Sequence, residues 1–225
     1  DATDSDLSDG ALYDIQANTW TSVSTTSAPS SGEGVKAVNI GLNRIAVFGG
    51  NTNVGGILDT STNSWTTMST VGAPSARKDH LLAYAKGKVL VYGGDDGSVV
   101  SDFKSYDIAS DTWTNHANSL DARKNHTYQV TDNKLLIFGG VDNSSNYVKN
   151  FVEVSLHDFT ATSISTDSSI FGGVRESAWI GSIGHHAFGY RNNHSGDSHG
   201  FILWGGSSDG SNQLSNGVIY KPDSY

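Results

Sequence analysis

The residues of this chain that could most readily carry chemistry gather in one irregular stretch near the C-terminus. Four histidines and an aspartate lie there: His185, His186, His194, His199 and Asp197. A metal site needs several neutral imidazoles or carboxylates that converge on one point. The spacing of these residues matches no compact metal-binding motif, and two adjacent histidines on a strand point their rings to opposite faces. We therefore predict no metal ligands here and expect a ligand-binding loop instead.

An aromatic residue in the same stretch favours binding of a sugar or a protein. Trp179 lies outside the regular pattern of the chain and has Asn, Asp, Arg and His residues nearby. An indole in that setting suits stacking on a sugar ring or anchoring a partner protein. Burial of the same ring against the scaffold is the structural alternative. The predicted ligand-binding residues are Trp179, Arg175, His185, Arg191, His194 and Asp197.

The sequence carries none of the common signatures of catalytic centres. It has no G-x-S-x-G, no phosphate-binding loop, no H-E-x-x-H and no cysteine nucleophile. We therefore expect a protein that is not an enzyme. The alternative is a sugar-active isomerase that draws its acid and base groups from Arg175, Glu176 and the histidines.

The first ten residues contain a cluster of carboxylates. Asp1, Asp4, Asp6 and Asp9 precede Gly10, and calcium prefers oxygen-rich loops of this kind. The spacing departs by one residue from D-x-D-x-D-G, and no Glu follows at the twelfth position. We interpret the cluster as a solvated acidic terminus and predict no cofactor, with calcium as the weaker alternative.

Composition excludes several classes of partner. The net charge is −9 and no block of Lys or Arg occurs, so the basic surface that nucleic acids require is missing. No apolar run reaches the roughly 20 residues of a membrane span. The chain begins at Asp1 rather than Met, so we expect a processed or excised product. Its acidic, Ser-, Thr-, Asn- and Gly-rich composition favours an extracellular or cell-surface location.

Most of the chain is organised by an internal repeat. Four apolar runs end in a glycine pair: Gly49 and Gly50, Gly93 and Gly94, Gly139 and Gly140, Gly205 and Gly206. Tryptophans recur with nearly the same period, at Trp20, Trp65 and Trp113, and Phe159 falls where a fourth aromatic is expected. Seven residues before these aromatics stand Tyr13, Leu58, Tyr106 and Val152. Two agreeing periodicities indicate one supersecondary unit of about 45 residues.

Each repeat predicts four short antiparallel strands separated by turn residues. The second strand ends in the glycine pair, the third carries the Tyr, and the fourth carries the Trp. Such a sheet has two apolar faces, which it can bury only against neighbouring sheets. The glycines let the backbone leave a crowded strand end, and the Trp fills the gap between sheets. Arg77 and His80 recur as Arg123 and His126, so we interpret them as architectural.

In the order of its Gly-Gly, Tyr and Trp, the chain resembles the kelch-repeat β-propellers. "GAPSAR", after Trp65, is similar to bacterial and fungal chains of the galactose-oxidase-like superfamily. The resemblance covers nearly the whole chain and implies an all-β fold of about four blade equivalents. It also implies roles as protein-interaction modules, sugar binders or, more rarely, enzymes. The copper chemistry of galactose oxidase is excluded, because its cross-linked cofactor needs a cysteine and this chain has none.

The repeat breaks in two places. Residues 160–198 form an irregular insertion, and long loops on a rigid scaffold often carry function. The chain also begins with third and fourth strands (1–24) and ends with strands of a last blade (199–225). We expect a single propeller domain, 1–225, whose two termini share one blade. Pairing of open ends between copies and excision from a larger propeller are the alternatives.

We expect a non-enzymatic, secreted or surface propeller that binds a glycan or a protein. A structural subunit that self-assembles into an oligomer or polymer through its terminal strands, and the sugar-active isomerase, are the alternatives.

Overall fold

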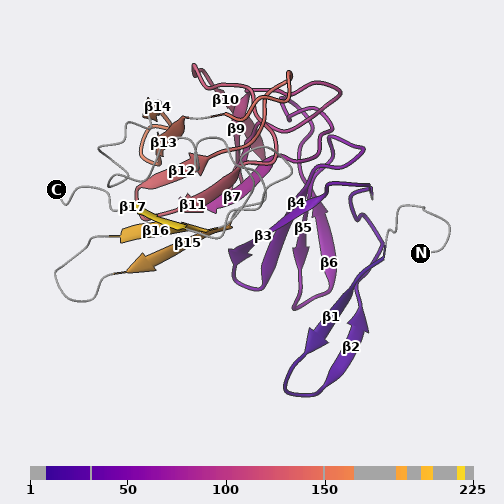
Figure 1. Ribbon diagram of the computed structural model, residues 1–225. Helices are drawn as coiled ribbons and strands as arrows, with labels where there is room; N and C mark the ends of the chain where they lie inside the picture. Colours follow the sequence, from indigo (N-terminus) through magenta and orange to yellow (C-terminus); the bar gives the residue numbers. More distant parts are fainter. Residues whose placement is uncertain are drawn as a thin grey trace. The chain divides into compact units, whose positions relative to one another are not determined.

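The computed structural model describes residues 9–30, 32–148, 150–164, 186–191, 199–204 and 217–220. All regular structure in these residues is β-strand, and the strands form five antiparallel sheets (Figure 1). Contacts divide the chain into two compact units, 1–92 with 103–115 and 93–102 with 116–225. Each unit is described by itself, and the interpretation of residues 1–225 as one domain stays a prediction.

The first unit contains two four-stranded sheets and a hairpin. The hairpin consists of β1 (Ala11–Asp14) and β2 (Thr19–Ser22). One sheet consists of β3 (Lys36–Gly41), β4 (Arg44–Phe48), β5 (Gly56–Asp59) and β6 (Ser64–Thr67). The other consists of β7 (Leu81–Ala85), β8 (Lys88–Tyr92), β9 (Phe103–Asp107) and β10 (Thr112–His116). In both sheets the strands pair in sequence order, which confirms the predicted four-stranded repeat.

The second unit follows the same pattern. One sheet consists of β11 (Thr127–Val130), β12 (Lys134–Phe138), β13 (Phe151–Ser155) and β14 (Ala161–Ile164). The last sheet consists of β15 (His186–Arg191), β16 (His199–Trp204) and β17 (Gly217–Tyr220). Among the described residues, β17 pairs with β16 and β1 pairs with β2. The sharing of one blade by the two termini therefore stays a prediction.

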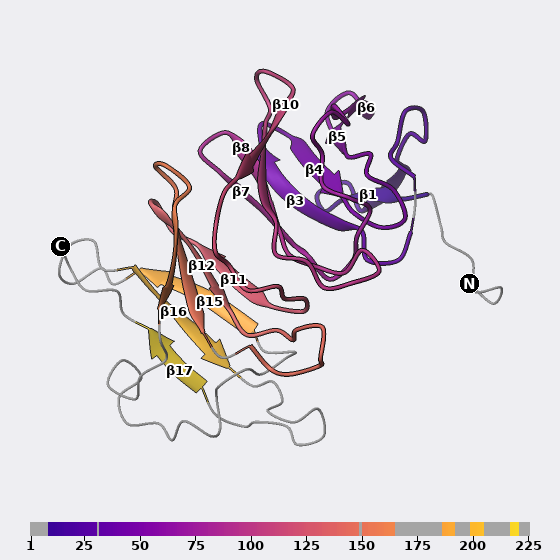
Figure 2. The ribbon, with the colours of Figure 1, turned by 90° about the horizontal axis from the view of Figure 1, so that it is seen from above.

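Apolar side chains pack the two four-stranded sheets of the first unit against each other. The buried cluster includes Phe48 and Met68 from one repeat and Leu82, Val91 and Tyr106 from the next. The first strands of these repeats, β3 and β7, lie side by side (Figure 2). Both sheets contribute, so neither face could be buried by its own sheet alone.

A carboxylate at the end of the third strand shapes the turn that follows. Asp59 accepts hydrogen bonds from the N–H groups of Ser61 and Thr62, at 2.9 and 3.3 Å. Asp14 and Asp107 make the same pair of bonds in their own turns. These turns contain a residue with positive φ, which Asn and Asp tolerate well: Asn18, Asn63 and Asp111. The sequence motif Tyr-Asp or Leu-Asp therefore encodes a hairpin turn.

In the first unit, each of the two four-stranded sheets makes two hydrogen bonds to the backbone of one serine in the preceding repeat. We call this pair of hydrogen bonds a clamp. Trp65 donates its Nε1–H to the carbonyl oxygen of Ser24 at 2.7 Å, while Asn63 Oδ1 accepts the Ser24 N–H at 3.0 Å. Trp113 and Asp111 hold Ser69 in the same way, at 2.7 and 2.8 Å. The Trp thus joins repeats by directed hydrogen bonds as well as by apolar area.

The fourth repeat departs from the expected placement of Phe159. The register of β13 and β14 pairs Val154 with Ala161, whereas Tyr13 pairs with Trp20 in the hairpin. Ala161 therefore occupies the Trp position, and Phe159 occupies the positive-φ turn position, with φ 58°. The prediction that Phe159 replaces the Trp is wrong. Strand pairing decides which residue lies at the Trp position, and Phe159 precedes that position by two residues. The Phe159 ring instead stacks on His116, with centroids 4.7 Å apart.

The first two glycine pairs pack against the Arg and His that open the next repeat, whereas Gly140 lies against Lys124 and His126 of its own repeat. Gly50 donates its N–H to the carbonyl oxygen of Arg77 at 2.8 Å, and Gly94 donates to that of Arg123 at 2.9 Å. Gly49 has φ +102°, and a Cβ there would collide with the imidazole of His80. A side chain at Gly49 would therefore not fit without a shift of its neighbours.

The arginines are buried and bond to carbonyl oxygens. Arg123 donates to the carbonyl oxygens of Gly139 and Asn150, both at 3.3 Å. Arg77 donates to the carbonyl oxygen of Ser75 at 3.1 Å. The architectural interpretation of these arginines is confirmed.

Replacing Gly49 by alanine should destabilise the protein strongly. The new methyl group would meet the His80 ring, and the backbone would be held at positive φ. We expect G49A to lower the free energy of unfolding by at least about 2 kcal/mol, measured by urea denaturation. The control is G87A, which also has positive φ (+77°) but no atom within 4 Å of the new Cβ. G87A should cost only about 1 kcal/mol, and an equal cost for both would contradict the proposed collision.

His80 should make stability depend on pH. Burial and the nearby Arg77 guanidinium lower the pKa of His80 to about 4, against about 6.5 in an unfolded chain. Between these values only the unfolded chain binds the proton, so stability is present above pH 6.5 and is lost as the pH falls towards 4. From pH 7 to pH 5 the wild type should lose about 2 kcal/mol more than H80Q does. Urea denaturation at both pH values tests this, and an equal loss in the two proteins would contradict it.

Candidate functional site

The ligand-binding residues predicted from the sequence fall almost wholly outside the described residues. Trp179, Arg175, His185, His194 and Asp197 lie outside them. Arg191 is the last residue of β15, opposite His199 in β16, and only its backbone is described. The binding loop therefore stays a prediction, as does the fourth glycine pair, Gly205 and Gly206.

The described residues bring together no metal-binding group. They contain no set of three or more His, Cys, Asp or Glu side chains placed to hold an ion. Of the N-terminal carboxylates, only Asp9 is described, and it is exposed. A membrane-spanning helix is likewise not found in the described part of the chain.

The best-defined candidate site lies at the β1–β2 hairpin, which is half of a repeat. In the complete sheets the third strand lies between a second and a fourth strand. β1 corresponds to a third strand and β2 to a fourth, and β1 has no second strand beside it in the described residues. One edge of β1 therefore presents N–H and C=O groups that could pair with another strand.

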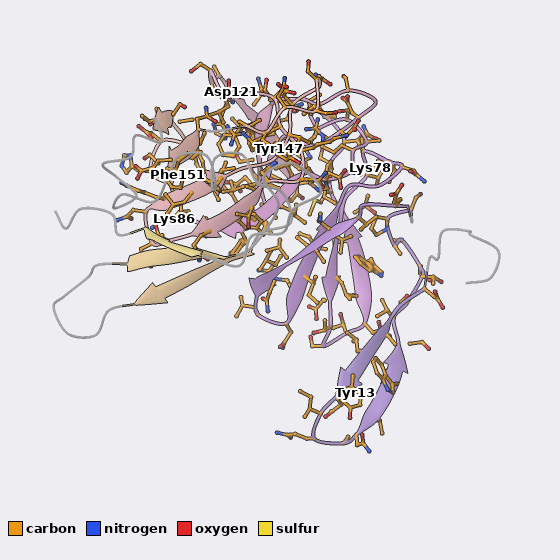
Figure 3. The ribbon with its side chains drawn as sticks, viewed as in Figure 1. Tyr13, Lys78, Lys86, Asp121, Tyr147 and Phe151 are labelled. Carbon is orange, nitrogen blue, oxygen red and sulfur yellow. The ribbon has the colours of Figure 1, made fainter. Side chains whose placement is uncertain are left out.

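The exposed fractions of side chains at equivalent positions in different repeats show how exposed the hairpin is. Tyr106, in the complete β7–β10 sheet, is 3% exposed, whereas Tyr13 on β1 is 45% exposed. Figure 3 shows Tyr13 on the β1–β2 hairpin. Trp20 on β2 is 71% exposed, whereas Trp65 and Trp113 are partly buried. Among the described residues, the same residue types are therefore covered in one repeat and open in the other.

The neighbouring β3–β6 sheet has an apolar face that is only partly covered. Along β4, Ala46 and Phe48 are buried in the core between repeats, while Ile45 and Val47 point to the other face and are half-exposed. In β8 and β12 the corresponding residues are buried on both faces. The open face of β4 is thus the surface that a complete preceding sheet would cover.

This face and the base of the hairpin enclose a hollow of about 340 Å³. Its apolar lining includes Val23, Val35, Ile45, Val47, Leu58 and Trp65. The polar residues of the lining are Asp9, Ser24 and Ser30. One carboxylate and two hydroxyls make neither a metal site nor an acid–base pair. The arrangement is suited to holding apolar side chains of an extended segment that pairs with β1.

Sequence reasoning assigned Tyr13 and Trp20 to the structural repeat and did not single them out for binding. Their residue types are those of the buried equivalents, so the type alone gives no signal. The available signal was the strand count, since the described strands include five third strands and four of every other kind. The structure adds which side chains this imbalance leaves exposed.

Comparison with family models agrees with this architecture. The model described as the KLHDC2/KLHL20/DRC7 Kelch-repeats domain matches residues 1–118 and 56–201. The chain belongs to the kelch-repeat family. A search of curated proteins gives no match. The predicted all-β, kelch-like fold with about four blade equivalents is confirmed, and kelch domains generally serve as non-catalytic scaffolds for protein interactions.

Proposed function

We propose that this kelch chain is a non-enzymatic binding propeller whose ligand is a protein, held as an extended strand at the open half blade. The observation that carries the proposal is the edge of β1 that no other described strand pairs with, beside the apolar hollow. An added strand would gain main-chain hydrogen bonds along β1, and its alternate side chains would enter the hollow.

Several features favour a protein ligand over a glycan at this site. The hollow is lined mainly by aliphatic side chains, whereas sugars need several polar partners placed around an exposed ring. The hydroxyl of Tyr13 is already engaged, since it donates to Asn18 Oδ1 at 2.6 Å. The glycan and isomerase alternatives depend on Arg175, Trp179 and their neighbours, which lie outside the described residues.

Selection of peptides on the intact chain tests this function. A displayed library of linear peptides should yield binders with alternating apolar residues. Val47→Asp should weaken their binding at least about tenfold, because it places a charge in the hollow. Leu42→Asp is the matched control, since Leu42 is 85% exposed and does not line the hollow, and it should bind like the wild type.

Two results would overturn the proposal. Selected peptides that bind V47D and the wild type equally would place the protein site elsewhere. A glycan array that gives ligands whose binding V47D does not affect, together with no peptide enrichment, would favour a sugar ligand.

We also propose an extracellular or cell-surface location, supported by the acidic composition, with 14 Lys and Arg against 23 Asp and Glu. An antibody against the chain should detect it in culture medium or on intact cells of the source. Signal only after lysis would contradict this location.

A further inference from the structure

Two motifs for N-linked glycosylation lie in the second unit. Asn125-His126-Thr127 and Asn143-Ser144-Ser145 both fit N-x-[ST], the sequence that accepts an oligosaccharide in the secretory pathway. A third match, at Asn193, lies outside the described residues. An N-linked glycan is bulky, so its asparagine must be exposed and must carry the sugar without breaking contacts of the fold. The two described motifs differ in this respect.

Asn143 is held in place by both atoms of its side-chain amide. Its Oδ1 accepts the N–H of Val99 at 2.6 Å, and its Nδ2 donates to the carbonyl oxygen of Val99 at 3.0 Å. Unlike the clamps of the first unit, this pairing uses one amide for both bonds, through the Nδ2 hydrogen on the same side as Oδ1. A substituent on an amide nitrogen prefers that side, as the next Cα does in a trans peptide bond. A sugar on Asn143 would therefore take the place of the hydrogen bonded to Val99.

Asn125 is exposed on a loop whose backbone is fixed on both sides. Before it, Lys124 exchanges two backbone hydrogen bonds with Val141, both at 3.0 Å. After it, His126 packs against Gly140. A sugar on the Asn125 side chain would leave both of these contacts in place.

The loop requires Asn or Asp at this position, but it does not require an amide. Asn125 has φ 56°, a left-handed conformation that Asn and Asp adopt more readily than most residues. The equivalent residue of the preceding repeat is Asp79, with φ 57°. The residue two positions later is Leu81 in that repeat and Thr127 here. The backbone therefore explains Asn or Asp, whereas the pairing of Asn125 with Thr127 makes the acceptor motif.

We propose that this chain carries an N-linked glycan on Asn125 and none on Asn143. The proposal rests on the extracellular or cell-surface location proposed above, since this glycan is added on the way there. The donor is an oligosaccharide linked to a polyisoprenyl diphosphate. Nδ2 of Asn125 forms a bond to C1 of the first sugar, the bond from C1 to the diphosphate oxygen breaks, and the lipid diphosphate leaves. The proton that Nδ2 loses passes through a base of the transferase to solvent.

Mass mapping of the secreted chain tests the site. The full chain is joined to a secretory leader and expressed in eukaryotic cells. Peptide N-glycosidase then removes the glycan in water enriched in heavy oxygen, which turns each glycosylated Asn into a labelled Asp. We expect the label on Asn125 and not on Asn143, with Asn193 read separately on its own peptide.

Three variants separate the glycan from the fold. Asn125→Asp removes the acceptor amide and keeps a residue that tolerates this φ, as Asp79 does. Thr127→Val removes the hydroxyl of the motif and keeps a β-branched side chain in β11. Both should lose the glycan on Asn125, and both should unfold, when made in bacteria, at the urea midpoint of wild type made in the same way. Asn143→Ala should keep that glycan and lower the midpoint, because Val99 loses two hydrogen-bond partners.

Either of two results overturns the proposed site. One is a secreted chain without the label on Asn125, and the other is a folded chain with the label on Asn143. Since the experiment supplies the leader, it tests the site separately from the natural location. An unglycosylated chain found only inside cells of the source would overturn the location and the natural use of the site. Asn125 does not line the hollow beside β1, so strand binding can fail independently of the glycan.

Discussion

The described part of the first unit depends on one pair of hydrogen bonds. In each case a Trp and an Asn or Asp bond to the backbone of one residue in the preceding repeat. This pair satisfies the N–H and C=O of Ser24 and of Ser69, backbone groups that a change of direction after a strand would otherwise leave unpaired.

A second set of contacts secures the opposite end of each sheet. The glycine pairs bring the second strand against the Arg and His of the next repeat, through the bonds from Gly50 to Arg77 and from Gly94 to Arg123. The buried guanidinium of Arg123 bonds to carbonyl oxygens that the irregular backbone exposes. In the first unit, two sets of directed contacts therefore join the two four-stranded sheets, and apolar side chains pack between them.

The candidate binding surfaces arise from the same rules where the repeat is incomplete. A four-stranded kelch sheet is stable when its apolar faces pack against neighbouring sheets. The β1–β2 half blade keeps the Tyr, Asn and Trp of a complete blade, but no second strand pairs with β1 among the described residues. The partly exposed apolar face of β4 lies next to this half blade, and the exposed rings of Tyr13 and Trp20 lie on it.

The sequence by itself determined the repeat, its four strands and the roles of Gly49, Arg123 and Trp113, because these depend on local periodicity and on backbone conformations that few residues adopt. It misplaced Phe159, because a two-residue offset between strands is set by pairing and leaves no mark in the spacing. It also gave no reason to separate Trp20 from Trp113, which are the same residue type in the same motif. Only the tertiary structure decided that one is covered and the other open, because burial depends on which sheet lies opposite.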